Sequence, residues 1–407
     1  MTEQIRNPKL RFRDNKGNDY SPWNLYSIKD VAKMSSGKSK KNENKGRYII
    51  MDMGTVTKNG TMLTHKSTPY ESDLLNKGDL VMVKDDIGGG HIIGKTIFIP
   101  ESQKYVLGDH VYRLEPKNYD GLFLHYCINS PIVNRSLKRK VTGSAQLGLN
   151  RKSVEEELIK IPSLEEQEKI GGFFSKLDQQ IELEEKKLEL LEQQKRGYMQ
   201  KIFSQQLRFK DENGNDYPEW KKRKLDDVAN YRRGSFPQPY GNKEWYDEKN
   251  GEPFVQVVDV DKNMKLHDKT KQKISDLAKP KSVKGFKGDI VVTLQGSIGR
   301  VAILQYDAYI DRTLLLINSF KIKMNKNYFN YVLYLLFLRE KERAPGGTIK
   351  TITKAVLSNF EIDIPTLEEQ NKIGMFFNEI DNLIELQNNK INHLKQRKQG
   401  LLQKMFV

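Results

Sequence analysis

The sequence predicts an α+β protein with two mixed α/β units and two long helices that pair as a coiled coil. Three observations support this fold class. The chain has 407 residues, which is too long for one ordinary domain and suits two or three. Two of its segments occur twice in nearly identical form, and each copy of the second segment carries a single apolar stripe at helical spacing.

The first repeated segment lies near the start of each half. Residues 10–23 read LRFRDNKGNDYSPW, and residues 207–220 read LRFKDENGNDYPEW, at an offset of 197 residues. The second segment reads IPSLEEQEKIGGFF at residues 161–174 and IPTLEEQNKIGMFF at residues 364–377, at an offset of 203 residues. Chance does not produce two such pairs, so the chain is a tandem duplication.

Between the repeated segments the two halves differ, although each retains a KGD-[LI]-V motif. Short apolar runs bounded by glycine-rich turns predict strands, and longer apolar runs predict helices. We expect strands at Asp79–Val83, Thr96–Ile99, Asp289–Leu294 and Arg300–Leu304, and helices at Gly121–Ile128 and Tyr328–Leu338. The predicted division of the chain is 1–22 (constant segment), 23–162 (variable unit), 163–203 (constant helix), 204–221 (repeated connection), 222–365 (variable unit) and 366–407 (constant helix).

Each constant helix is about 40 residues, or roughly 60 Å, long. Ser163 and Thr366 follow a proline and precede Glu166 and Glu369 by three residues, which is the capping-box pattern. A helix this long with one apolar stripe needs a partner, and its own duplicate is the economical one. The stripes consist of Leu164, Ile170, Phe174, Leu177, Ile181, Leu188 and Leu191 in the first helix, and Leu367, Ile373, Phe377, Ile380, Ile384, Ile391 and Leu394 in the second.

Charge and composition restrict the partners and the compartment. The formal net charge of +16 favours a polyanion such as nucleic acid or an acidic membrane face, although 53 acidic residues leave an ordinary solvated surface as an alternative. The single cysteine, Cys127, excludes an internal disulfide and indicates a reducing compartment. The sequence shows no secretory h-region and no run of about eighteen apolar residues, so we expect a cytoplasmic protein without a membrane span.

The sequence contains no complete catalytic or metal-binding motif in a suitable structural context. Gly89 to Thr96 satisfies the P-loop string G-x4-G-K-[ST], but a P-loop must begin a helix, and the residues that follow are strand-like and end at Pro100. The six histidines lack metal-ligand spacing, and the paired prolines of amino-methyltransferase loops are absent. We therefore expect a non-catalytic chain that binds no metal and no cofactor of its own.

Basic and amide side chains cluster within both variable units. Lysine and arginine hold phosphates, while arginine, glutamine and asparagine can also read base edges in the major groove. Each residue alone has an equally good explanation as exposed surface charge, but the recurrence before each IP motif favours a DNA-binding role. The predicted DNA-binding residues are Lys38, Lys40, Lys41, Lys138, Arg139, Lys140, Gln146, Asn150 and Arg151 in the first half, and Arg232, Arg233, Gln238, Arg343, Lys350 and Lys354 in the second.

The order of these segments resembles the specificity subunit of type I restriction–modification systems. The resemblance covers essentially the whole chain and is most specific at residues 162–170 and 365–373, at the KGD-[LI]-V motifs, and at the helix ends LEQQKRGYMQKIF and LKQRKQGLLQKMF. It implies two target-recognition domains, each of which reads one half of a bipartite DNA sequence. It also implies that the constant helices pair antiparallel with approximate two-fold symmetry, set the spacing and dock two modification subunits.

The resemblance further implies that the chemistry belongs to partner subunits. Adenine methylation with S-adenosylmethionine would take place on the modification subunits, and cleavage driven by ATP and Mg²⁺ would need restriction subunits. Two alternatives from other classes remain: a nuclease or methyltransferase in its own right, which the missing motifs disfavour, and a non-catalytic protein-binding adaptor with non-specific nucleic-acid affinity. The sequence does not disclose the bases recognised, because indirect readout adds specificity without contacts.

Overall fold

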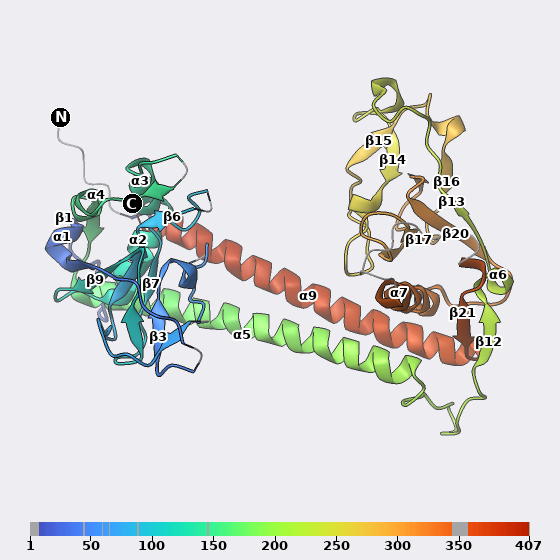
Figure 1. Cartoon of the computed structure of the whole chain (residues 1–407), viewed down its shortest axis with the longest axis horizontal. Helices are drawn as coiled ribbons and strands as arrows, with labels where there is room; N and C mark the ends of the chain where they lie inside the picture. Colours follow the sequence, from blue (N-terminus) through green and yellow to red (C-terminus); the bar gives the residue numbers. More distant parts are fainter. Residues whose placement is uncertain are drawn as a thin grey trace. The chain divides into compact units, whose positions relative to one another are not determined.

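The computed structural model describes residues 8–43, 45–58, 60–64, 66–87, 89–144, 146–343 and 357–406, and the side chains of 341–343 are not among them. The chain forms two compact units, residues 1–189 with 387–407 and residues 190–386. Unit 1 and unit 2 each contain one variable region, the first part of the long helix that follows it and the last part of the other long helix (Figure 1). The predicted α+β class is confirmed.

Unit 1 contains a four-stranded antiparallel sheet and a three-stranded sheet. In spatial order, the first sheet consists of β2 (Ala32–Ser36), β9 (Val111–Pro116), β5 (Leu80–Val83) and β7 (Thr96–Phe98). The second consists of β4 (Ser67–Thr68), β3 (Tyr48–Met51) and β8 (Tyr105–Leu107), with β3 and β8 parallel.

Strand β5 shows why the central strands are apolar at every position. Successive side chains of a strand point to opposite faces of the sheet. Leu80 and Met82 enter the core beneath the helices, whereas Val81 and Val83 enter a second core shared with β3 and β8. Both faces of the sheet are therefore covered, and unit 1 consists of helices, a central sheet and an outer sheet.

Unit 2 repeats this arrangement. Its central sheet consists of β13 (Ala229–Arg233), β20 (Leu314–Phe320), β17 (Ile290–Thr293) and β18 (Val301–Ile303), and its outer sheet of β15 (Gln272–Ile274), β14 (Glu252–Val255), β19 (Ala308–Ile310) and β16 (Val283–Gly285). Strand β17 divides its side chains between two cores as β5 does. The strands predicted at Asp79–Val83, Thr96–Ile99, Asp289–Leu294 and Arg300–Leu304 are confirmed, each slightly shorter.

Short elements complete each unit. Strand β1 pairs with β11 and β12 pairs with β21, so the two ends of each variable region lie side by side. The bounds are β1 (Asn24–Ser27), β6 (Asp85–Asp86), β10 (Leu147–Gly148), β11 (Leu158–Ile161), β12 (Lys221–Lys224), β21 (Glu361–Ile364), α1 (Ile28–Val31), α4 (Arg151–Glu155), α6 (Leu225–Val228), η1 (Met53–Thr55), η2 (Lys243–Trp245), η3 (Val257–Asp259) and η4 (Lys279–Lys281).

The helix over the central sheet differs between the units for a local reason. In unit 1 it is divided into α2 (Gly121–Asn129) and α3 (Pro131–Arg139), and in unit 2 it is one helix, α7 (Lys326–Arg343). Proline at position 131 suits the first turn of a helix but cannot continue one, and Ser130 caps the new helix. Both helices predicted in this region are confirmed.

The long helices α5 (Leu164–Phe203) and α9 (Leu367–Met405) pack antiparallel inside each unit. In unit 1, Lys398 lies 2.5 Å from Asp178, and Gln387 donates from Nε2 to the Glu184 Oε2, 2.7 Å away. In unit 2, the Nζ of Lys195 lies 2.6 Å from the Oδ1 of Asp381. The antiparallel direction is as predicted, whereas knobs-into-holes packing of a coiled coil stays a prediction.

The apolar stripe of each long helix packs on the variable region as well as on the other long helix. Ile170 and Phe174 are fully buried in the core of unit 1, and Ile373 and Phe377 are fully buried in that of unit 2. The same cores contain the end of the other long helix, with the rings of Phe174 and Phe406 and those of Phe377 and Phe203 each 6.0 Å apart. The stripes therefore pack on both partners.

Further along the helices the stripe residues mediate the helix pairing or lie at its edge. Leu164 was predicted to belong to the apolar stripe, and this is wrong. It lies in the first turn, ahead of the packed part of the helix, and is 48% exposed. The remaining stripe residues are buried or half-buried: Leu177, Ile181, Leu188, Leu191, Leu367, Ile380, Ile384, Ile391 and Leu394.

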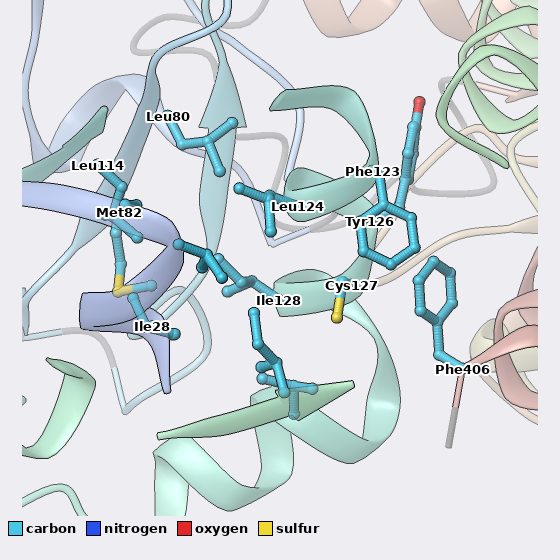
Figure 2. Close-up of a cluster of buried hydrophobic side chains, with 14 of the residues drawn as sticks. Ile28, Leu80, Met82, Leu114, Phe123, Leu124, Tyr126, Cys127, Ile128 and Phe406 are labelled. Carbon is cyan, nitrogen blue, oxygen red and sulfur yellow. The ribbon is translucent and has the colours of Figure 1, made fainter. Parts of the chain in front are cut away.

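The last turn of each long helix closes the core of the unit at its far end. Figure 2 shows the Phe406 ring facing Phe123 and Cys127 of α2, and the two phenylalanine rings are 5.7 Å apart. In unit 2, Phe203 stacks on Tyr328 with ring centroids 5.8 Å apart. The repeated sequence at each helix end thus supplies the same aromatic contact twice.

Each repeated opening segment is attached to the start of a long helix by a buried carboxylate. Arg11 donates from Nη2 to Glu166, 2.7 Å away, and Trp23 donates from Nε1 to the same carboxylate at 3.3 Å. Arg208 and Trp220 make the same bonds to Glu369. The predicted capping box forms by half in unit 2, where the Thr366 hydroxyl accepts from the Glu369 amide at 3.4 Å. The other half needs correction, because the glutamate carboxylates accept from the opening segment rather than reaching back to the helix start.

Candidate nucleic-acid interface

The basic residues near the end of the first variable region lie beside a glycine-rich loop. Strand β10 pairs with β6, which brings residues 146–148 next to Asp85 and Asp86. Lys138 donates from Nζ to the carbonyl oxygen of His91, 3.3 Å away. Lys138, Leu147 and Gly148 therefore lie beside β6 and His91, and Arg139 and Gln146 nearby in the sequence are exposed.

Several residues predicted to contact DNA make internal contacts. Lys140 pairs with the buried Glu157 at 2.6 Å, and Arg151 donates to Glu155 at 2.7 Å and to the Met34 carbonyl at 2.9 Å. Asn150 accepts from the Ser153 amide at 2.8 Å, capping α4. These contacts position the surface, and they leave fewer free donors than the sequence suggested.

The three lysines after β2 do not act as one cluster. Lys40 donates to Ser72 at 2.7 Å and pairs with Asp73, and its side chain is largely buried. Lys41 pairs with Glu43 at 2.8 Å but remains exposed, as does Lys38. Of the three, Lys38 and Lys41 have side chains available to a ligand.

In unit 2 the predicted residues lie on or near an edge strand. Arg232 and Arg233 are exposed at the end of β13, which is the edge of the central sheet. Gln238 is exposed and is followed by a cis bond to Pro239. Lys350 and Lys354 lie outside the described residues, and Arg343 ends α7 with its side chain outside the described part.

Sequence reasoning missed a basic edge in the outer sheet of unit 2. Lys269, Lys271 and Lys273 occupy alternate positions leading into and within β15, and Glu248 and Asp268 lie beside them. They line a hollow of about 420 Å³ with Tyr306. The alternating lysines in the sequence DKTKQK were the available signal.

An aromatic and cationic group next to Gln238 was also missed. The Arg312 guanidinium lies 4.9 Å from the centre of the Tyr240 ring, and the Tyr240 hydroxyl donates to Asp311 at 2.6 Å. A guanidinium held over a ring is a geometry that also stacks on bases. Its parts are distant in sequence, so no local pattern reveals it.

The P-loop string forms a turn that leads into a strand, as predicted. Gly94 adopts φ +69, and Thr96 begins β7 rather than a helix. His125, beneath this strand, is buried, and burial lowers the pKa of its imidazole to about 3, so the ring is neutral. Among the described residues, no group of three His, Cys, Asp or Glu could hold a metal ion, and no helix is long and apolar enough to span a membrane.

Comparison with known proteins identifies relatives over 93% of the chain. The type I restriction enzyme MjaVIII specificity subunit of Methanocaldococcus jannaschii is 26% identical over 406 residues, which cover 93% of this chain and 91% of that protein. The MjaX specificity subunit of the same organism is 26% identical and is covered to 92%.

Two solved structures share the fold. The S subunit of a type I restriction–modification system from M. genitalium superposes with a TM-score of 0.65 at 15% identity, covering 99% of both chains. A chain from a study of complex assembly and conformational transition of the type I R-M system gives a TM-score of 0.59 at 18% identity, covering 95% and 98%.

The family described as type I restriction modification DNA specificity domain matches residues 20–193 and residues 217–396. These two matches begin in the two repeated opening segments and end in the two long helices. The chain belongs to this family and carries its domain twice.

Proposed function

We propose that this chain is the sequence-specific DNA-recognition subunit of a type I restriction–modification complex. The observation that carries the proposal is that the two units share one framework but differ in their exposed polar side chains. The frame of each unit is the same, down to the Arg–Glu–Trp contacts at Glu166 and Glu369, whereas the exposed polar side chains differ. A duplicated frame suits two identical partners, and different surfaces suit two different half-sites.

In this proposal the chain recognises DNA and leaves catalysis to partners. Two modification subunits would dock on the long helices and methylate adenine with S-adenosylmethionine, and restriction subunits would supply ATP- and Mg²⁺-dependent cleavage. The charge of +16 supports DNA as the ligand of this chain. We place the protein in the cytoplasm, where its DNA substrate lies.

The proposal is tested by exchanging one recognition unit. The complex is reconstituted with its modification subunits, and its methylation sites are read by methylome sequencing. Replacing residues 222–365 with the corresponding region of another family member should change one half-site and leave the other intact. The matched exchange of residues 23–162 should change the other half-site.

Three results would contradict the proposal. A change of both half-sites by one exchange would contradict independent reading. Weak binding that does not depend on DNA sequence and that survives neutralisation of Lys38, Arg139, Arg232 and Arg233 would favour the protein-binding adaptor instead. Methyl transfer by the purified chain alone would show that it is itself an enzyme.

A further inference from the structure

Each unit contains a cleft between its variable region and the two long helices. The cleft of unit 1 has a volume of about 500 Å³, and that of unit 2 about 300 Å³. The helix residues that line them are equivalent in the duplication, at the same offset of 203 residues. These pairs are Asp178 with Asp381, Ile181 with Ile384, Lys398 with Lys195, and Leu402 with Met199.

The variable regions contribute equivalent walls. A turn closed by an isolated β-bridge supplies Lys58 in unit 1 and Lys262 in unit 2. The helix over the central sheet supplies Asn129 in unit 1 and Tyr334 in unit 2. The clefts are therefore one feature that was retained twice, although the sequences of the variable regions diverged.

A three-residue network fixes the floor of each cleft. In unit 1 the hydroxyl of Tyr126 donates to Asp178 at 2.8 Å, and Lys398 pairs with the same carboxylate while lying 5.3 Å from the centre of the tyrosine ring. In unit 2, Tyr331, Asp381 and Lys195 form the same network, with the lysine 5.0 Å from the ring centre. The charge of each Asp is thus compensated within the network.

Besides Lys395, which pairs with Glu185 in unit 1, two further cations line each cleft with no ion pair among the described residues. In unit 1 they are Lys58 and Lys95, and in unit 2 they are Lys262 and Arg196. The unit 2 lining also contains Glu192. The Lys95 ammonium donates only to the Asn129 carbonyl, 3.3 Å away, and partial burial lowers the pKa of Lys95 to about 8. A desolvated cation of this kind gains from an anion that enters the cleft.

We propose that each cleft binds one backbone phosphate of duplex DNA, held by Lys58 and Lys95 in unit 1 and by Lys262 and Arg196 in unit 2. This inference rests on the proposed function and adds a sequence-independent anchor beside each half-site. With all charged lining residues counted, the unit 1 cleft carries two net positive charges and the unit 2 cleft carries one. Both clefts therefore favour an anion, and recognition of a phosphate requires no base. This explains why the cleft recurs where the recognition surfaces do not.

The test is the salt dependence of DNA binding by the reconstituted complex with its modification subunits. The probes are a duplex that contains the methylated sequence and a scrambled duplex of equal length. Replacing Lys58 and Lys95 by glutamine should weaken binding to both duplexes by the same factor, on the order of tenfold. The slope of log affinity against log salt should become shallower by about 0.9, corresponding to one phosphate.

The control removes the same charge elsewhere. Lys104 and Lys186 are exposed residues of unit 1 that pair with Glu101 and Glu182, and their replacement by glutamine should leave affinity and slope within about twofold of wild type. The unit 2 variant, Lys262→Gln with Arg196→Gln, should reproduce the loss. Thermal unfolding of each variant verifies that the fold is intact.

Three results would overturn the inference: an unchanged slope, a loss confined to the methylated sequence, or a loss of assembly with the modification subunits at unchanged DNA affinity. The last result would assign the clefts to protein docking. Failure of the proposed function would look different, because the wild-type complex would then not distinguish the two duplexes at all.

Discussion

Arg11 illustrates how one side chain attaches a repeated segment to its unit. Its guanidinium meets Glu166, whose side chain is fully buried, and Trp23 donates to the same carboxylate. Removing one partner of a buried ion pair leaves an uncompensated charge. We expect Arg11→Ala to lower the free energy of unfolding by about 3 kcal/mol, measured by urea denaturation.

Arg13 provides the matched control. It pairs with Asp19 at 3.4 Å, and both side chains are largely exposed. Arg13→Ala should change stability by less than about 0.5 kcal/mol. Equal losses for the two variants would show that the Glu166 contact is not the anchor of this segment.

His125 makes the stability of unit 1 depend on pH. The folded protein holds the imidazole pKa at about 3, below its ordinary value of 6.5, so the unfolded chain binds the proton more readily. The corresponding stability is fully present above pH 6.5 and is lost as pH falls toward 3, at about 1.4 kcal/mol per pH unit.

The position equivalent to His125 in unit 2 is Asn330, which makes asparagine a suitable replacement. We expect His125→Asn to flatten the decrease in unfolding free energy between pH 6.5 and pH 5, relative to wild type. Parallel profiles for the two proteins would mean that the protonation of another group causes the decrease.

At the residue scale, the contacts of a side chain can be predicted only when its partner is close in the sequence. Charge density correctly selected exposed residues such as Arg139 and Arg232. It could not show that Lys40 is held by Ser72 and Asp73, because those acceptors are more than thirty residues away. Lys95 lies in the rejected P-loop string, and only the fold shows that it lines a cleft.

At the scale of elements, the repeated glycine of the IP segment has a steric cause. A Cβ atom on Gly171 would lie 2.6 Å from the Asp120 carboxylate and 2.9 Å from the Phe123 amide nitrogen, at the start of α2. The equivalent Gly374 approaches Asn325 in the same way. The close approach of the two helices therefore requires a residue without a side chain.

We expect Gly171→Ala to destabilise the protein by about 2 kcal/mol through overpacking. A methyl group added at the adjacent Gly172 would have no neighbouring atom within 4 Å, so Gly172→Ala should instead be neutral or stabilising by up to about 1 kcal/mol. Chemical denaturation of both variants decides the point. A loss at Gly172 equal to that at Gly171 would indicate a general effect on the helix.

The four strands and two helices predicted in the variable regions follow from periodicity and turn residues, which are local signals, and Pro131 explains the division of α2 from α3. Most of the other strands are short, and none of them was predicted. The second partner of each apolar stripe, the variable region, was not predictable. Ile170 and Phe174 have the spacing of a helix-pairing seam, and the same spacing equally suits the sheet-and-helix core on which they pack.

At the scale of the whole molecule, the long helices are shared between the units. Helix α5 belongs to unit 1 as far as Glu189 and to unit 2 from Leu190, and α9 passes between them at Leu386. Close to these points Gln387 donates to Glu184, and these two residues occupy equivalent positions in the duplication. Hydrogen bonds between equivalent residues therefore fix the pairing register of the two helices close to the point where each helix passes from one unit to the other.

We expect the length of the helix segments at these points to set the gap between the two DNA half-sites. Inserting four residues after Glu189 and four after Leu386 adds about one turn, or 6 Å, to both helices and nearly preserves the faces they present. The pairs Lys398–Asp178 and Lys195–Asp381 lie within single units and should survive. We expect methylome sequencing to show unchanged half-sites separated by a longer gap.

A single insertion after Glu189 is the control, because it lengthens one helix only and shifts the register between its two pairings. It should reduce complex stability instead of producing a new uniform gap. If the double insertion left the gap unchanged, the helices would not set the spacing, and the spacing would have to come from the recognition units or the modification subunits.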